Sequence, residues 1–202
     1  MSELKIFKMK DKGDKFKTDK KTIFSIPFRL VITGKTGCGK TSALGSLILL
    51  NQFYNKDFRG DNIYIFSPME NDFKMAQIIK EKAVPPMNVY KEFDDDILNA
   101  LYDKLVEEYK ERVAGKKRPH NTLIILDDMS FDGSLRGGLY NSVSRVFCNG
   151  RKHLISIIIT SQYLSHILPV CLSNISGGMF YNMSDRQLDL LSDHYNYFEG
   201  GK

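Results

Sequence analysis

The segment that decides the fold is residues 28–41, Phe-Arg-Leu-Val-Ile-Thr followed by Gly-Lys-Thr-Gly-Cys-Gly-Lys-Thr. The first six residues form a short apolar run that predicts a buried β-strand. The next eight match the pattern G-x-x-x-x-G-K-[ST], and residues 40–51 have helix-forming composition with one apolar face. A strand, a glycine-rich loop and a helix in this order predict a phosphate-binding loop, known as the Walker A motif.

Each residue type in this loop suits the binding of a nucleoside triphosphate. The glycines let backbone N–H groups point inward at phosphate oxygens, and the start of the helix adds its positive dipole end. Lys40 is expected to reach the β- and γ-phosphates, and the Thr41 hydroxyl is expected to be a ligand of Mg²⁺. The predicted nucleotide contacts are Gly34, Lys35, Thr36, Gly37, Cys38, Gly39, Lys40 and Thr41.

Lys35 has two interpretations. A lysine at this position also occurs in MinD-like ATPases, but those carry a glycine next, where this chain has Thr36. The alternative is a solvent-facing lysine at the edge of the loop.

A second motif lies at residues 123–128, Leu-Ile-Ile-Leu-Asp-Asp, and has the form of a Walker B strand. The apolar run predicts a buried strand whose carboxyl end delivers two acids to the ligand-binding edge of the sheet. Asp127 is expected to bind Mg²⁺ directly or through water, and Asp128 to orient or deprotonate the attacking water. A plain Asp-Asp loop after a core strand is the alternative.

Two further candidates flank the apolar run at residues 155–160. Gln162 follows the run, where an amide can contact both the γ-phosphate and the attacking water. Arg151 precedes it, at the sheet edge that faces away from the chain's own nucleotide. An arginine there can serve a neighbouring subunit as an arginine finger, or it can be a surface arginine in a basic turn. Arg145 and Arg136 are the fallback candidates.

Apolar runs that alternate with helical patterns predict an α/β fold, a mostly parallel central sheet flanked by helices. We expect a basic N-terminal arm at residues 1–22, which holds eight lysines against four acids, and one domain at residues 23–202. No apolar run is long enough to span a bilayer. The three cysteines are widely spaced and indicate neither a disulfide framework nor a zinc site.

The order of these motifs resembles the genome-packaging ATPases of large DNA viruses and virophages, in the FtsK–HerA branch of the P-loop ATPases. The resemblance covers residues 28–195. It implies an ATP- and Mg²⁺-dependent motor that moves double-stranded DNA without sequence specificity into a preformed capsid. It also implies a homo-oligomeric ring, a pentamer or hexamer, at a capsid vertex or portal, in the host cytoplasm or the virion.

The same resemblance implies that Arg151 is the finger acting in trans, that Gln162 is the sensor, and that residues 155–160 form an additional strand, as in RecA- and FtsK-like proteins. Two departures are visible. The superfamily most often has glutamate where Asp128 stands, and the chain ends before the final strand that we expect, so a C-terminal truncation is a further expectation.

Other functions compete with a packaging motor. A helicase or translocase of replication or repair shares these motifs, and a nucleotide-dependent assembly switch would hydrolyse ATP without translocation. A GTPase is disfavoured because no NKxD motif is present, and a nucleoside kinase because residues 163–184 contain no arginine for a lid. For DNA contact we consider basic groups such as those of the loop at 115–120, and we expect the loop at 129–138 to couple hydrolysis to movement. For either loop, a solvated surface turn is the alternative.

Overall fold

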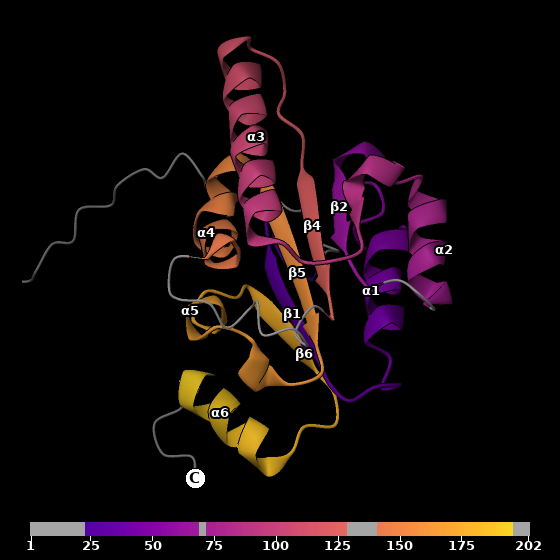
Figure 1. The fold of residues 1–202 in the computed structure, drawn as a ribbon, viewed down its shortest axis with the longest axis vertical. Coiled ribbons are helices and arrows are strands. Elements are labelled where there is room, and N and C mark those ends of the chain that lie inside the picture. The colour runs from indigo at the N-terminus through magenta and orange to yellow at the C-terminus, as the bar shows by residue number, and fades with distance from the viewer. Residues whose placement is uncertain (1–22, 69–71, 129–140, 196–202) are drawn as a thin grey trace, which may run out of the picture.

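The computed structural model describes residues 23–68, 72–128 and 141–195. Its centre is a sheet of six parallel strands in the order β3-β2-β4-β5-β1-β6 (Figure 1). The strands are β1 Arg29–Thr33, β2 Ile63–Phe66, β3 Val89–Tyr90, β4 Thr122–Asp127, β5 Ile155–Ser161 and β6 Gly177–Phe180. The predicted parallel α/β fold is confirmed. The additional strand is confirmed as well, because β5 lies between β1 and β4.

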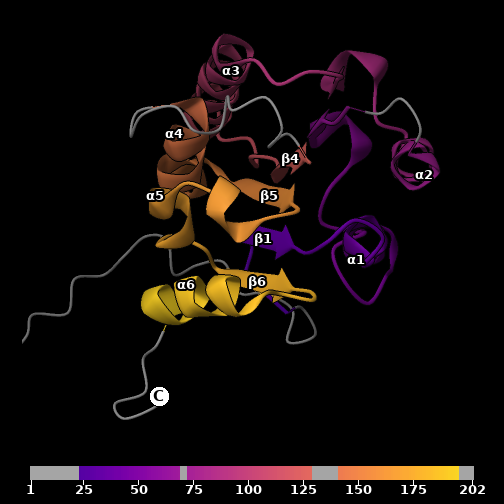
Figure 2. The same cartoon turned by 60° about the horizontal axis from the view of Figure 1, so that its bottom comes forward.

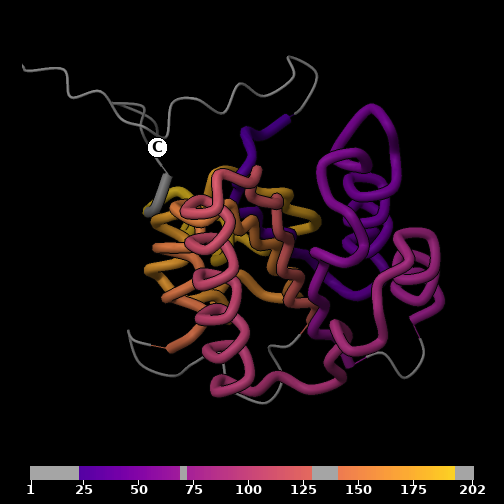
Figure 3. Tube along the Cα trace, turned by 90° about the horizontal axis from the view of Figure 1, so that it is seen from above, coloured from indigo at the N-terminus to yellow at the C-terminus, as the bar shows by residue number. Residues whose placement is uncertain are grey.

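Helices cover both faces of this sheet (Figures 1 and 3). The helices are α1 Lys40–Leu49, α2 Phe73–Lys82, α3 Asp95–Ala114, α4 Ser142–Asn149, α5 Pro169–Leu172 and α6 Asp185–Tyr195. Short 3₁₀ turns are η2 Gly60–Asn62, η3 Pro86–Asn88, η5 Gly150–His153 and η6 Leu164–His166. Helices α1 and α2 lie on one face and α3, α4 and α5 on the other, while α6 lies at the β6 end of the sheet (Figure 2).

Alternation along the strands divides the core into two halves, because successive side chains point to opposite faces. Ile124 and Leu126 of β4 pack towards α3 and α4. Their neighbours Leu123 and Ile125 pack towards α1 and α2. Every residue of β4 and β5 is buried, which explains why their sequences are nearly continuous apolar runs.

The parallel arrangement brings the carboxyl ends of all six strands to one edge of the sheet, the lower edge in Figure 1. The phosphate loop follows β1, Asp128 follows β4 and Gln162 follows β5, so all three lie at that edge. Arg151 and the 115–120 loop precede β5 and β4 and lie at the opposite edge. Within the described ranges, no helix combines the length and apolar character needed to cross a bilayer.

Candidate functional site

The phosphate loop leaves β1 at Gly34, whose N–H donates to the carbonyl of Ser161 at 3.1 Å. Gly37 and Gly39 have φ angles of 79° and 105°, in a region that side-chain-bearing residues rarely adopt. Glycine is required at residue 34 for a different reason, because a Cβ there would lie 2.7 Å from atoms of Tyr181 and Cys38. The loop can therefore curl tightly only with glycine at these positions.

Lys40 begins α1 and is buried. Its Nζ donates to the Gly34 carbonyl at 2.7 Å and to the Lys35 carbonyl at 3.3 Å, so the ammonium group lies inside the curl of the loop. The side chain of Lys35, in contrast, is exposed. The next residue, Thr41, donates its hydroxyl to Asp72 Oδ2 at 3.3 Å.

Asp127 is the last residue of β4 and is 6 % exposed. Both its oxygens accept hydrogen bonds, Oδ1 from the Thr160 hydroxyl at 2.6 Å and Oδ2 from the Ser67 hydroxyl at 3.0 Å. Burial raises the pKa of Asp127, the two hydroxyl donors oppose this rise, and the nearby charges of Asp128 and Asp72 add to it. A bound cation would favour the charged carboxylate that burial disfavours.

Asp128 and Gln162 form a pair. The Gln162 amide donates to Asp128 Oδ2 at 2.9 Å, while Oδ1 is buried and has no hydrogen-bond partner among the described residues. The backbone of Asp128 has a φ of 50°, and its N–H donates to the hydroxyl of Thr160 at 3.0 Å. One oxygen of Asp128 is thus held by Gln162, and the other is a buried acceptor without a hydrogen bond from the described residues.

Residues of the phosphate loop and both acids line a cavity of about 270 Å³, whose walls are Thr36, Gly37, Gly39, Lys40, Thr41, Asp72, Lys74, Asp127 and Asp128. The structure therefore brings together the loop and the two acids that the sequence singled out. It also adds two residues from the start of α2, Asp72 and Lys74, which sequence reasoning missed. The sequence signals Asp72 only as a helix N-cap.

The donor set of this cavity fits Mg²⁺. No group of three His, Cys, Asp or Glu side chains in the described ranges is arranged to hold a metal alone. Mg²⁺ in nucleotide sites is usually held by one or two protein oxygens together with phosphates and waters. The hydroxyl of Thr41 and the carboxylate of Asp127 match this pattern.

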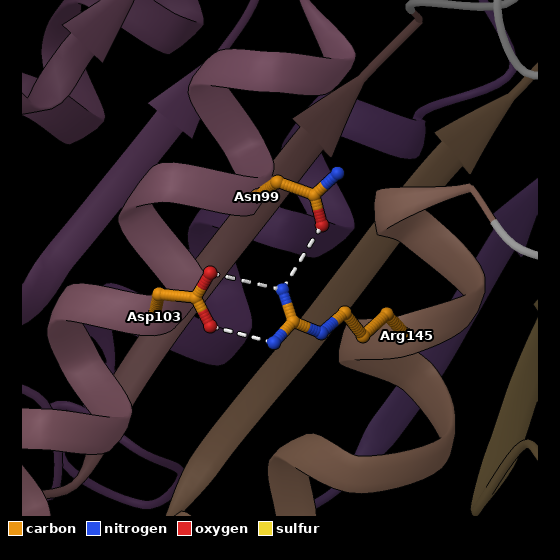
Figure 4. Close-up of polar contacts among 3 residues, drawn as sticks. All are labelled: Asn99, Asp103 and Arg145. Atoms are coloured by element: carbon orange, nitrogen blue, oxygen red, sulfur yellow. Dashed lines mark hydrogen bonds and ion pairs between the residues drawn. The ribbon is translucent and has the colours of Figure 1, made fainter.

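Arg151 is exposed in η5, at the edge opposite the cavity. Its charge lies near Arg29, whose pKa is lowered by burial and then by Arg151. The fallback candidate Arg145 is engaged elsewhere (Figure 4): it donates to both oxygens of Asp103, at 2.6 and 3.1 Å, and to Asn99 at 3.3 Å. Its guanidinium also lies 4.7 Å from the centre of the Tyr102 ring.

Arg136 and the 129–138 loop lie outside the described residues, as do the 1–22 arm and residues 196–202. The basic loop at 115–120 is described, and its side chains are exposed except at Pro119, which is half-buried. It lies beside Arg112, whose Nε donates to the Arg118 carbonyl at 3.1 Å.

Solved structures with the same fold include an ATPase and an NTPase. EssC (ATPases 2 and 3) from Geobacillus thermodenitrificans superposes with a TM-score of 0.61 at 16% identity, covering 85% of this chain and 35% of that one. The genome packaging NTPase B204 from Sulfolobus turreted icosahedral virus 2, in complex with AMPPCP, gives 0.56 at 14% identity, covering 83% of this chain and 80% of that one. The chain thus spans about a third of the EssC chain, 35%. At these identities the likeness establishes the fold.

The sequence itself gives the family. No curated protein sequence matches the chain. A family model described as Poxvirus A32 protein matches residues 14–198. The resemblance to viral packaging ATPases of the FtsK–HerA type is confirmed by this match together with the fold. Since the match covers most of its length, the chain belongs to the Poxvirus A32 protein family.

Proposed function

We propose that the chain is an ATP-hydrolysing motor that moves double-stranded viral DNA into a preformed capsid. The proposal that the chain hydrolyses ATP rests on one cavity, which is lined by residues of the phosphate loop, Asp127 and Asp128. The packaging role is supported by membership of the Poxvirus A32 family and by the fold shared with B204, a genome packaging NTPase. We assign this activity to one ATPase domain, residues 23–202.

In this proposal the loop from Gly34 to Thr41 binds the phosphates through its N–H groups. Lys40 exchanges its bonds to the loop carbonyls, 2.7 and 3.3 Å long, for phosphate oxygens. Thr41 and Asp127 would hold Mg²⁺, which would supply positive charge to neutralise the triphosphate. The short bond from Thr160 fixes the direction in which the Asp127 carboxylate points.

Asp128 then orients the attacking water and accepts its proton. We assign the water to Oδ1, because it is the oxygen that has no hydrogen-bond partner among the described residues, whereas Oδ2 is held by Gln162. Gln162 thereby links the position of the base to the end of β5 and serves as the sensor of the γ-phosphate.

Arg151 belongs to the site of a neighbouring subunit in a homo-oligomeric ring. Its exposure at the sheet edge opposite its own cavity supports this role, because a group at that edge can reach a neighbour's γ-phosphate. The ring would act on the DNA backbone without sequence specificity, at a capsid vertex or portal, in the infected cytoplasm or the virion.

The first test is the ATPase rate with and without double-stranded DNA, for wild type and Lys40→Ala. Lys40→Ala should reduce the rate by at least about a hundredfold, because a charge at the phosphates typically contributes several kcal/mol to the transition state. The control is Lys91→Ala, an exposed lysine distant in sequence from the motifs. Full activity in Lys40→Ala would refute the site. If a verified ring hydrolyses ATP at the same rate with and without DNA, the result would favour a nucleotide-dependent assembly switch over a motor.

The second test addresses the finger. Subunits carrying Arg151→Ala have an intact cavity, and subunits carrying Asp127→Ala have an intact arginine. If Arg151 acts in trans, mixed rings contain some complete sites and regain part of the activity. Absence of rescue at every mixing ratio would exclude the trans role.

A further inference from the structure

Asp72 has two contacts of different kinds. Its Oδ1 accepts from the N–H groups of Lys74 and Met75 at 2.8 and 3.2 Å, which is an ordinary N-cap of α2. Its Oδ2 accepts from the hydroxyl of Thr41 at 3.3 Å. The cap uses only Oδ1, so Oδ2 is left to contact the phosphate loop through Thr41.

The start of α2 is held against the start of α1. Beside the contact between Asp72 and Thr41, Lys74 Nζ donates to the hydroxyl of Ser42 at 2.7 Å. Both Asp72 and Lys74 line the cavity that contains Lys40 and Asp127. Asp72 is therefore part of the wall of the nucleotide cavity.

The hydroxyl of Thr41 has one proton and two lone pairs. As a metal ligand it uses a lone pair, and its proton then needs an acceptor. The hydrogen bonds that Asp127 accepts come from Thr160 at 2.6 Å and from Ser67 at 3.0 Å, and its remaining lone pairs are the ones proposed to face the cation. The acceptor that the structure supplies is Asp72.

We infer that Asp72 is a positioning residue of the magnesium site, which accepts the Thr41 proton and so directs an oxygen lone pair of Thr41 at the cation. The inference rests on the proposed ATPase function and adds to it a residue from α2. The negative charge of Asp72 also favours the metal–nucleotide complex over the bare triphosphate, since it attracts the cation and repels the phosphates.

This role has a signature that an N-cap lacks. With Mg²⁺ present, loss of the charge at residue 72 should weaken nucleotide binding. Without a divalent cation, the same loss should leave binding unchanged or strengthen it, because a repulsive charge near the triphosphate has been removed. A residue that only stabilises α2 would change both affinities in the same direction.

The test is Asp72→Asn, because asparagine caps a helix as well as aspartate and keeps the shape of the side chain. Affinity for a non-hydrolysable ATP analogue is measured with Mg²⁺ and with a chelator, and the ratio of the two is the result. We expect the gain in nucleotide affinity that Mg²⁺ provides to fall about tenfold, which corresponds to about 1.4 kcal/mol of binding free energy. The matched control is Asp94→Asn, since Asp94 caps α3 in the same way, at 2.8 and 3.0 Å, outside the cavity.

An unchanged ratio in Asp72→Asn, or an equal fall in Asp94→Asn, would overturn the inference while leaving the ATPase proposal intact. Asp72→Ser provides a second neutral cap, shorter than asparagine, and should show the same loss if Asp72→Asn folds poorly. Wild-type protein that binds no analogue under either condition would refute the proposed function itself. The two failures are thereby separable.

Discussion

Replacement of Thr160 by valine should show how the fold holds a buried carboxylate at the end of β4. Thr160 is 1 % exposed, and its hydroxyl donates to Asp127 Oδ1 at 2.6 Å. Valine has the same shape but places a methyl group against that oxygen. The N–H of Asp128 also loses the hydroxyl as an acceptor, but it keeps the carbonyl of Thr160 at 3.2 Å.

The loss of stability in Thr160→Val should depend on pH. A hydrogen bond to a charged group contributes about 1.5–3 kcal/mol, and a neutral one about 1 kcal/mol. Burial already raises the pKa of Asp127, and removal of the Thr160 donor, which opposes that rise, should raise it further. At a pH where the carboxylate is charged, we expect a loss of about 2–3 kcal/mol. In acid, where Asp127 is protonated, the loss should fall to about 1 kcal/mol.

The assay is urea unfolding without nucleotide, followed by circular dichroism at pH 7.5 and pH 4. The control is Thr160→Ser, which keeps the hydroxyl and removes one methyl group. It should lose about 1 kcal/mol at both pH values. An equal loss at both pH values for Thr160→Val would refute the reasoning, because it would mean that the hydroxyl does not stabilise a charged Asp127.

Three further predictions concern charge and burial. The pKa of Asp127 is raised in the folded state, so the stability that this group contributes is complete below the ordinary carboxyl pKa and is lost as the pH rises through the raised pKa. We therefore expect Asp127→Asn to unfold at a higher urea concentration than wild type at neutral pH. This difference should shrink as the pH falls towards 4. Arg145→Ala removes an exposed pair with Asp103, so thermal unfolding should show a loss of about 1 kcal/mol, whereas loss of ATPase activity would contradict the placement of Arg145 outside the site. Burial raises the pKa of Cys171 to about 12, so iodoacetamide at pH 8 followed by peptide mapping should label the exposed Cys148 and spare Cys171 in folded protein.

The parts of the site that are continuous in sequence could be predicted. The phosphate loop is readable because successive backbone N–H groups must surround one ligand, which fixes glycines at set spacings. Asp127, Asp128 and Gln162 were placed at one edge because parallel strands bring their carboxyl ends together. Their pairing could not be foreseen, since Gln162 and Asp128 meet only through the register of β4 and β5.

Contacts between separate helices left no signal in the sequence. Arg145 and Asp103 are 42 residues apart, so helical spacing rules do not connect them. The start of β6 at Gly177 also leaves little signal in the sequence, because glycines have low strand propensity. The four-residue helix α5 was missed, although Pro169 at its start is a recognised initiation signal.

The strand order explains why a third carboxylate belongs in this site. Because β5 separates β1 from β4, the strand that carries the phosphate loop and the strand that carries Asp127 lie two spacings apart, about 10 Å. Asp127 is paired in register with Thr160 of β5, and its other oxygen is taken by Ser67 beyond β2. Its hydrogen bonds therefore go to its own neighbours in the sheet. The hydroxyl proton of Thr41 is instead accepted by Asp72, a residue outside the sheet, because α2 packs against α1.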